Sequence, residues 1–137
     1  MEIKILNEDN SSLEELLKNS FHKDVNKIII KECLDNNIRF LCALDSNVVV
    51  STIMITTKYN PVRGTKSYYL DYICTKEEYR NKGLAHTLLQ EVESLAKKEE
   101  ISKIELDTSY DREEAQKLYE KCGYIKRDAY LYIKEIN

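Results

Sequence analysis

The sequence predicts an α/β (mixed α+β) fold in which helices flank a central, mixed, mostly antiparallel, twisted sheet. Three observations support this prediction. Residues 38–75 are rich in β-branched and alternating side chains, which is typical of consecutive antiparallel strands. Helical and strand patterns then alternate from residue 84 onward, which favours helices on both faces of the sheet. The full order is strand, two helices, three strands, helix, strand, helix and a closing strand or hairpin.

The length and composition indicate one domain covering residues 1–137. A chain of 137 residues buries roughly two-thirds of the surface that its unfolded form exposes, so it can build a core without disulfides or metals. The apolar share of 42% and the charged share of 33% are those of an ordinary globular protein. Only 3 Gly and 1 Pro exclude a collagen-like or low-complexity chain, so we expect each glycine to occupy a position that requires it.

Charge, hydropathy and cysteine spacing exclude several function classes. The net charge is −3, and the absence of a block of five like charges argues against a nucleic-acid-binding arm. The N-terminal residues show no signal-peptide pattern, and the apolar runs at 28–30 and 48–50 are too short to span a membrane. The 4 Cys form no CxxC pair and the 2 His lie far apart in sequence, so no metal site is expected. We therefore expect a cytoplasmic protein with four reduced, mostly buried thiols.

The N-terminal elements are predicted from alternation and capping signals. Residues 3–6 alternate and indicate a short strand. Ser11 to Glu14 resembles a capping box, after which leucines recur on one helical face. Asp24 is expected to cap a second helix, which ends at Asn36-Asn37.

The middle of the chain predicts an antiparallel meander. A strand at 38–44 is followed by a hairpin turn at 45–47 and a β-branched strand at 48–57. Residues 59–64 read as a loop, and residues 67–75 as the next strand.

The last part of the chain alternates helices and strands. A polar link at 76–82 closes at Gly83, and Leu84, Leu88, Val92 and Leu95 then recur at helical spacing. A strand is expected at 101–106. Residues 111–114 signal the start of a helix that stops at Gly123. Residues 124–136 alternate and predict a closing strand or hairpin.

The stretch from Tyr72 to Ala85 carries the most chemistry. A turn containing Gly83 leads directly into a helix, whose first backbone N–H groups are unpaired and carry a partial positive charge. Arg80 and Lys82 add positive charge at the same place. The arrangement favours a phosphate or pyrophosphate ligand, although it is neither a P-loop nor a GxGxxG turn. A solvated turn is the alternative reading of these residues taken alone.

Two sequence blocks resemble the GNAT superfamily of acetyl-CoA-dependent N-acetyltransferases. The family pattern Arg/Gln-x-x-Gly-x-Gly/Ala is matched by Arg80, Gly83 and Ala85. About thirty residues later, the pattern Ala-x-x-Leu/Phe-Tyr-Glu-Lys-x-Gly-Phe/Tyr is matched throughout. Its matching residues are Ala115, Leu118, Tyr119, Glu120, Lys121, Gly123 and Tyr124. Asn81 stands where the family commonly has Gly, so only Gly83 is expected to supply a flexible backbone position.

The resemblance implies an acyl-CoA N-acyltransferase-like fold and a set of acetyl-CoA contacts. The backbone at the end of the central strand would pair with the pantetheine arm, and the turn would hold the pyrophosphate. These residues are Ile73, Cys74 and Thr75 on the strand and Arg80, Asn81, Lys82, Gly83, Leu84, Ala85 and His86 in the turn and helix. Tyr119 stands where the family has a tyrosine facing the coenzyme A sulfur. Arg112 stands where many members carry Asn near the pantetheine, and as an arginine it would instead reach a phosphate.

The implied reaction is direct attack of an amine on the thioester in a ternary complex. An alkylammonium of pKa ~10.4 is deprotonated in only about one molecule in 2,500 at pH 7, so its proton needs an acceptor. Asp71 resembles the acidic residue that many members carry beside the acyl site, acting through water or docking the ammonium. Period-two alternation predicts that Asp71 shares a sheet face with Tyr69 and Ile73.

Other functions stay open at this point. A coenzyme A-binding sensor without transferase activity, or an unrelated phosphate-binding α/β domain, would fit the same turn. Cys74 has no adjacent His to activate it as a nucleophile. The acceptor amine is unidentified, with a polyamine, an antibiotic or a protein amine as candidates. The chain is expected to act as a monomer or homodimer.

Overall fold

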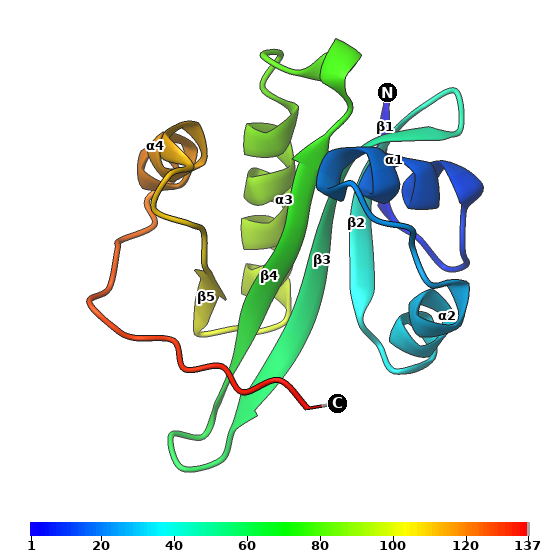
Figure 1. Ribbon diagram of the computed structural model, residues 1–137. Helices are drawn as coiled ribbons and strands as arrows, with labels where there is room; N and C mark the ends of the chain where they lie inside the picture. The colour runs from blue at the N-terminus through cyan, green and yellow to red at the C-terminus, as the bar shows by residue number, and fades with distance from the viewer. Residues whose placement is uncertain (137) are drawn as a thin grey trace. The chain divides into compact units, whose positions relative to one another are not determined.

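The computed structural model describes residues 1–136 and contains five strands and four α-helices among them (Figure 1). The strands are β1 (Glu2–Ile5), β2 (Arg39–Asp45), β3 (Val48–Asn60), β4 (Thr65–Thr75) and β5 (Lys103–Leu106). The helices are α1 (Ser11–Phe21), α2 (Lys27–Asp35), α3 (Leu84–Lys98) and α4 (Glu113–Lys121), with a short 3-10 turn, η1, at Glu77–Tyr79.

All five strands form one sheet in the order β1-β2-β3-β4-β5. The first four strands pair antiparallel, and β5 joins β4 in parallel, as its connection through α3 requires. The sheet and α1–α3 belong to one compact unit, Met1–Asp107. A second unit begins at Thr108 and contains α4. The predicted fold class, a mixed and mostly antiparallel sheet with flanking helices, is confirmed.

Helices cover both faces of the sheet. Figure 1 shows α1 in front of the strands and α3 behind them. The buried cluster on the α1 side consists of Leu6, Leu13, Leu16, Leu17, Phe40, Cys42, Leu44 and Val49. On α3, Leu88, Leu89, Val92 and Ala96 are buried, as their helical spacing predicts. Each fully buried leucine contributes about 1.5–3 kcal/mol to folding through the hydrophobic effect.

The first two helices begin at asparagines, which corrects the predicted capping residues. The Asn10 side chain accepts from the Ser12 N–H at 2.8 Å, so the cap lies one residue before the expected Ser11. Asn26 accepts from the N–H groups of Ile28 and Ile29, whereas Asp24 forms an exposed ion pair with Lys18. Asn, Asp and Ser are nearly equivalent N-cap residues, so the sequence alone does not select among neighbours.

The turn of the β2–β3 hairpin was predicted correctly, whereas the strands of the β3–β4 hairpin were predicted too short. Ser46 and Asn47 both have positive φ and join the paired residues Asp45 and Val48, as a two-residue hairpin turn requires. The β3–β4 hairpin is longer than predicted, because β3 continues to Asn60 and β4 begins at Thr65.

The cysteines are less buried than expected. Cys42 is fully buried, and burial raises the pKa of its thiol to about 11. Cys33, Cys74 and Cys122 are only half-buried. The prediction of mostly buried thiols is therefore wrong for three of the four positions.

The predicted closing strand at residues 124–136 is wrong. No strand is assigned there, and the six large apolar side chains of 125–136 are between 75% and 91% exposed. Alternation shows which side chains would share a face, but a strand forms only when a neighbouring strand accepts its hydrogen bonds. The Tyr124 N–H instead bonds the Tyr119 carbonyl at 3.0 Å, which closes the C-terminal end of α4.

Candidate active site

The parallel pair β4–β5 separates partway along β4. Pairing ends at Leu70 and Leu106, whereas β4 continues to Thr75. The Tyr69 hydroxyl donates to the Asp107 carboxylate, which ties the two strands together just before they part. Within Met1–Asp107, β4 therefore pairs with β3 as far as Thr75 but with β5 only as far as Leu70. A strand-like ligand that adds to the sheet would do so on this side of β4, beyond Leu70, which we call the open edge.

A β-bulge lies at the start of this open edge. Asp71 pairs with Met54 and Cys74 with Thr52, so Tyr72 and Ile73 together face Ile53. Tyr72 has φ of 50°, a conformation that costs a non-glycine residue on the order of 1–3 kcal/mol.

The bulge changes which side chains share a face. Cross-strand partners lie on the same side of a sheet, and Met54 and Thr52 are two residues apart. Asp71 therefore shares its face with Cys74, and the prediction that it shares a face with Ile73 is wrong. The extra residue shifts the alternation by one position.

The Asp71 carboxylate is half-buried on the α1 side of the sheet. Cross-strand pairing puts it beside Met54, which packs against the cluster under α1. Burial raises the pKa of Asp71 above its ordinary value. No hydrogen bond or ion pair to this carboxylate is found within Met1–Asp107. A half-buried carboxylate with a raised pKa and no ion-pair partner is a stronger base than an exposed one, and it attracts a cation.

The turn after β4 is held to the strand that precedes it. The Arg80 Nε donates to the Thr75 carbonyl at 2.9 Å, and the Tyr79 hydroxyl donates to the Asp45 carboxylate at 2.5 Å. The Lys82 ammonium lies 5.6 Å from the centre of the Tyr79 ring. These contacts fix a turn that carries two cationic side chains.

Two residues of the turn adopt left-handed backbone conformations. Gly83 has φ of 77°, and Asn81 has φ of 61°. Asn is one of the few residues with a side chain that tolerates this region, so it replaces Gly at low cost. The expectation that Gly83 alone supplies the flexible position is therefore corrected, since Asn81 supplies a second.

The N-terminus of α3 is uncapped. Gly83 provides no side-chain hydrogen bond, and the first turn of the helix holds no acidic residue. No acceptor for the backbone N–H groups of residues 81–86 occurs among residues 1–136. This differs from α1 and α2, whose first N–H groups are bonded by asparagine side chains. An uncapped, positively polarised helix end flanked by Arg80 and Lys82 is suited to binding an anion.

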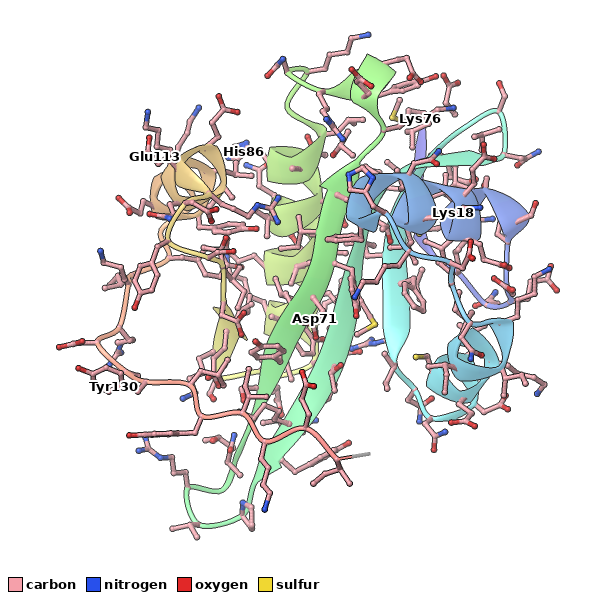
Figure 2. All side chains as sticks on the ribbon, in the orientation of Figure 1. Lys18, Asp71, Lys76, His86, Glu113 and Tyr130 are labelled. Atoms are coloured by element: carbon pink, nitrogen blue, oxygen red, sulfur yellow. The ribbon has the colours of Figure 1, made fainter. Side chains whose placement is uncertain are left out.

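The structure thus brings most of the predicted contact residues together. Figure 2 shows Asp71 partway along β4, Lys76 just beyond its end, and His86 on the first turn of α3. The predicted strand residues Ile73, Cys74 and Thr75 immediately precede η1 and the turn, and Leu84 and Ala85 begin the helix.

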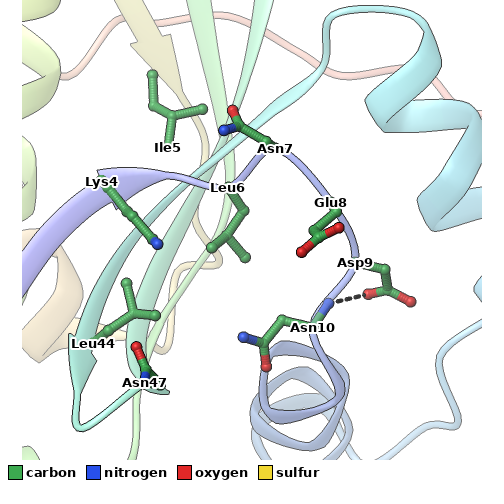
Figure 3. A pocket seen from close by; sticks show the side chains of 9 residues that line it. All are labelled: Lys4, Ile5, Leu6, Asn7, Glu8, Asp9, Asn10, Leu44 and Asn47. Carbon is green, nitrogen blue, oxygen red and sulfur yellow. Dashed lines mark hydrogen bonds between the residues drawn. The ribbon is translucent and has the colours of Figure 1, made fainter.

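One hollow in the first unit adjoins the turn, and another lies away from it. A groove of about 220 Å³ is lined by residues of α1, the start of β3 and the link after β4, including Lys76 and Arg80. The other hollow, about 250 Å³, lies between the β1–α1 loop and the β2–β3 hairpin (Figure 3). It contains none of the residues predicted for the site, and its Asp9 carboxylate accepts from the Asn10 N–H at 2.8 Å.

The two remaining predicted residues belong to the second unit. Arg112 is the N-terminal cap position of α4 and is exposed. Tyr119 lies on α4 with its ring 6.2 Å from that of Tyr124. Burial raises the pKa of Tyr119, and the charge of Arg112 partly opposes this shift. The phenol therefore stays protonated throughout the physiological pH range.

The aromatic pair formed by Tyr72 and Phe21 was not predicted from the sequence. Their rings meet edge to face, with centroids 5.2 Å apart and planes at 83°. Phe21 ends α1 and lies far from Tyr72 in the sequence, and the bulge at Tyr72 leaves no trace in the alternation. The contact follows from the packing of α1 against the sheet, which no local pattern in the sequence specifies.

Residues 1–136 contain neither a membrane-spanning helix nor a metal-binding cluster. No described helix is both long and apolar enough to cross a membrane. No three His, Cys, Asp or Glu side chains gather closely enough there to hold a metal ion.

Comparisons with known proteins agree on one family. The model of the acetyltransferase (GNAT) family matches residues 4–124. Aminoglycoside N(6')-acetyltransferase type 1 of Acinetobacter baumannii is 23% identical over 119 residues, which cover 83% of this chain and 82% of that protein. The structure of a ribosomal-protein-alanine N-acetyltransferase from Brucella melitensis biovar Abortus 2308 has a TM-score of 0.83 at 22% identity, covering 99% of this chain and 100% of that one.

A further solved structure is described with the acyl donor. A predicted acetyltransferase with acetyl-CoA from Clostridium acetobutylicum has a TM-score of 0.79 at 20% identity, covering 97% of this chain and 95% of that one. These structures share the fold in which we find an open strand edge leading into an uncapped helix. The chain belongs to the GNAT family of acetyltransferases, enzymes that transfer an acetyl group from acetyl-CoA to an amine.

Proposed function

We propose that this protein acetylates a primary amine by direct attack on acetyl-CoA within a ternary complex. The observation that supports this proposal is the continuity of the open β4 edge with the uncapped end of α3. The edge offers strand-type hydrogen bonds and the helix end offers anion binding. Acetyl-CoA contains both an amide-bearing arm and a pyrophosphate, so one ligand would use both.

The turn would hold the pyrophosphate. The backbone N–H groups of 81–86 supply donors, and Arg80 and Lys82 add charge beside them. A Cβ built at Gly83 has no atom within 4 Å, so the space in front of the turn is open to a ligand. The Arg80 guanidinium already donates from Nε to the Thr75 carbonyl, which leaves its two terminal nitrogens for a phosphate.

The open edge at Ile73–Thr75 would hold the pantetheine arm. Cys74 pairs with Thr52 and Thr75 with Ser51 on the β3 side, so these residues are fixed before any ligand arrives. The Ser51 hydroxyl further bonds the Cys74 carbonyl at 3.1 Å and the Thr75 hydroxyl at 2.8 Å. A preorganised edge binds a strand-like ligand with less loss of conformational entropy.

The chemical step forms a C–N bond and breaks a C–S bond. The amine lone pair attacks the thioester carbonyl carbon, and the thiolate of coenzyme A leaves. The proton lost from the nitrogen passes to the Asp71 carboxylate through water, or Asp71 first docks the ammonium. The raised pKa of Asp71 reduces the mismatch between this carboxylate and an amine of pKa ~10.4.

The second unit would supply the remaining groups. Tyr119 would donate a hydrogen bond to the departing thiolate, since its phenol remains protonated at physiological pH. Full proton transfer to a thiolate of ordinary pKa ~8.5 from a phenol of pKa above ~10 is uphill, so stabilisation by hydrogen bonding is the assigned role. Arg112 would contact a phosphate of coenzyme A.

The acceptor class is suggested by the comparisons. The curated relative is named for acetylation of an aminoglycoside and one structural neighbour for a ribosomal-protein alanine. An amino sugar and a peptide α-amine are therefore the first acceptors to test, together with a linear polyamine.

The test is thiol release from acetyl-CoA in the presence of each amine, paired with thermal unfolding in coenzyme A. Turnover with at least one amine and a rise in Tm with coenzyme A are expected. A rise in Tm without turnover on any amine would favour a coenzyme A-binding sensor. The absence of any thermal shift would contradict both the proposed donor site and the sensor alternative.

A further inference from the structure

A carboxylate and an exposed aromatic ring follow one another along β4 at the bulge, and both lie on the side of the sheet that α1 covers. Asp71 and Tyr72 are consecutive, and Phe21 at the end of α1 packs edge to face against Tyr72. We call these three residues the amine subsite. We propose that it binds the acceptor as a primary alkylammonium, held between the Asp71 carboxylate and the Tyr72 ring. The inference rests on the proposed function and adds the residues that select the acceptor.

The Tyr72 ring is held in place yet open to solvent. Tyr72 is 51% exposed although its backbone is strained at φ of 50°. A strained residue persists where its surroundings hold it, and Phe21 provides that support through an edge-to-face contact. The result is an aromatic ring that α1 supports on one side and that is half open to solvent. Phe21 packs against the core under α1, so the exposed half of the Tyr72 side chain is the part left for a ligand.

The electrostatics of the subsite favour a cation. The Asp71 carboxylate is half-buried and has no hydrogen bond or ion pair within Met1–Asp107, so a bound ammonium would offset part of the cost of its desolvation. The C-terminal end of α1 at Phe21 adds the negative end of a helix dipole. Lys18, the basic residue in the last turn of α1, is engaged by Asp24 at 3.1 Å (Figure 2).

The chemistry selects one class of acceptor. A carboxylate together with a ring face recognises a compact cation through an ion pair and a cation–π contact. Aliphatic primary amines are cationic at pH 7, whereas anilines are neutral and gain neither contact. The subsite thus predicts amino sugars or linear polyamines as substrates and disfavours aromatic amines.

The test compares the leucine and phenylalanine variants of Tyr72. Both keep an apolar side chain, but only Y72F keeps the ring. Thiol release is measured while the amine is varied at saturating acetyl-CoA, with an amino sugar, spermidine and a peptide that begins with alanine as separate acceptors. We expect Y72L to raise the amine KM by about 3- to 30-fold, the range of a cation–π contact, and Y72F to stay within about twofold.

The KM for acetyl-CoA separates this subsite from the donor site. It should be unchanged in Y72L, as should the Tm shift with coenzyme A. Tyr59→Leu, at a tyrosine that is 75% exposed near the far end of β3, is the matched control and should leave both KM values unchanged. F21L should raise the amine KM in the same direction as Y72L, because it removes the support of the ring.

The assays distinguish failure of the amine subsite from failure of the proposed function. If the wild type turns over an amine and Y72L leaves the amine KM unchanged, the subsite is wrong and the proposed function stands. If Y72L and Y72F raise the amine KM equally, the ring is not what binds the ammonium, and the inference also fails. If the wild type acetylates no amine, both the subsite and the proposed function are overturned.

Discussion

Asn81 and Gly83 share a backbone conformation that would suit the turn to binding an anion. Both adopt positive φ, the conformation found in turns whose backbone N–H groups form an anion-binding concavity. The Asn81 side chain makes no hydrogen bond that would explain its presence among residues 1–136, so its backbone conformation is the reason for the residue type. Asn and Gly are the residues that adopt this conformation with least strain.

Substitutions at Asn81 test this explanation directly. Asn81→Gly should leave the KM for acetyl-CoA within about twofold, because Gly populates positive φ freely. Asn81→Ala should raise it by about 5-fold or more, since a Cβ without a local hydrogen-bonding group costs roughly 1 kcal/mol or more in this region. Steady-state kinetics with varied acetyl-CoA measure both. Equal KM values for the two variants would show that the turn does not depend on this conformation.

We expect the ionised Asp71 carboxylate to lower the stability of the folded protein, although the proposed reaction needs it. Burial raises its pKa in the folded state, so ionisation opposes folding. This contribution is absent below the pKa of the unfolded chain, near 3.9, and grows as pH rises through the folded-state pKa. Asp71→Asn should therefore raise the Tm at pH 7, lose that advantage below about pH 4, and lower kcat/KM.

Thermal unfolding across pH and thiol-release assays check this prediction. Asp35→Asn is the control, since its carboxylate is 60% exposed and pairs with Lys31 on α2, and it should leave the Tm and the activity close to wild type. A Tm at pH 7 that falls in Asp71→Asn would mean that the carboxylate has a stabilising partner after all.

At the scale of elements, one polar cluster joins β2, β4 and α3. The Arg39 guanidinium donates to both carboxylate oxygens of Glu99, at 2.9 and 2.8 Å, and to the Tyr68 hydroxyl at 3.1 Å. The Tyr68 hydroxyl also donates to Glu99. Burial is the main cause that raises the pKa of Tyr68 to about 12, and Arg39 lowers the pKa of Glu99. The cluster fixes the C-terminal end of α3 to the sheet, and with it the direction of the helix.

Removing the two-pronged contact should weaken this attachment measurably. Arg39→Lys retains the charge but not the paired donors, so we expect the free energy of unfolding to fall by about 1 kcal/mol. Urea unfolding at pH 7 measures the change. Lys31→Ala, which breaks an exposed ion pair with Asp35, is the control and should cost less than about 0.5 kcal/mol. If both variants lose the same small amount, the Arg39 cluster adds nothing beyond an ordinary surface pair.

The elements also show where sequence reasoning succeeds and where it stops. Leu84, Leu88 and Val92 recur at a helical period, so α3 was predictable from residue spacing alone. The bulge at Tyr72 was not, because an inserted residue leaves the composition of a strand unchanged and only shifts its register. The prediction of a closing strand was wrong for a different reason. Residues 124–136 have the alternation of a strand, but strand pairing depends on a neighbouring strand that a local pattern does not specify.

The candidate site also contains one part that the sequence predicted and one part that it did not. The turn at 80–86 was located from Arg80 and Gly83 because an uncapped helix start has a local signature. The Phe21–Tyr72 contact depends on how α1 packs across the sheet, and no local signal encodes it. A turn that opens a helix is thus easier to predict from a sequence than a contact between side chains that meet by packing, and the binding role of the turn stays a prediction.

At the scale of the whole molecule, the proposed reaction draws on both units. The donor turn and Asp71 belong to Met1–Asp107, whereas Tyr119 and Arg112 belong to the unit that begins at Thr108. A chain whose first unit alone carried the activity would need no residue of α4. The Tyr119 hydroxyl is therefore the group whose removal tells whether the second unit takes part in chemistry or only in folding.

Tyr119→Phe removes that hydroxyl and keeps the ring that packs against Tyr124. If Tyr119 stabilises the leaving thiolate, kcat should fall by about 10²–10⁴-fold, the usual contribution of a positioned acid. The KM for acetyl-CoA and the Tm should stay close to wild type. Because burial raises the pKa of Tyr119, its loss should lower kcat by a constant factor between about pH 6 and pH 9, instead of shifting the pH profile. Tyr110→Phe, at a tyrosine of the same unit that is 99% exposed, is the control and should have no effect. An unchanged kcat in Tyr119→Phe would assign this tyrosine to packing and leave stabilisation of the thiolate to another group.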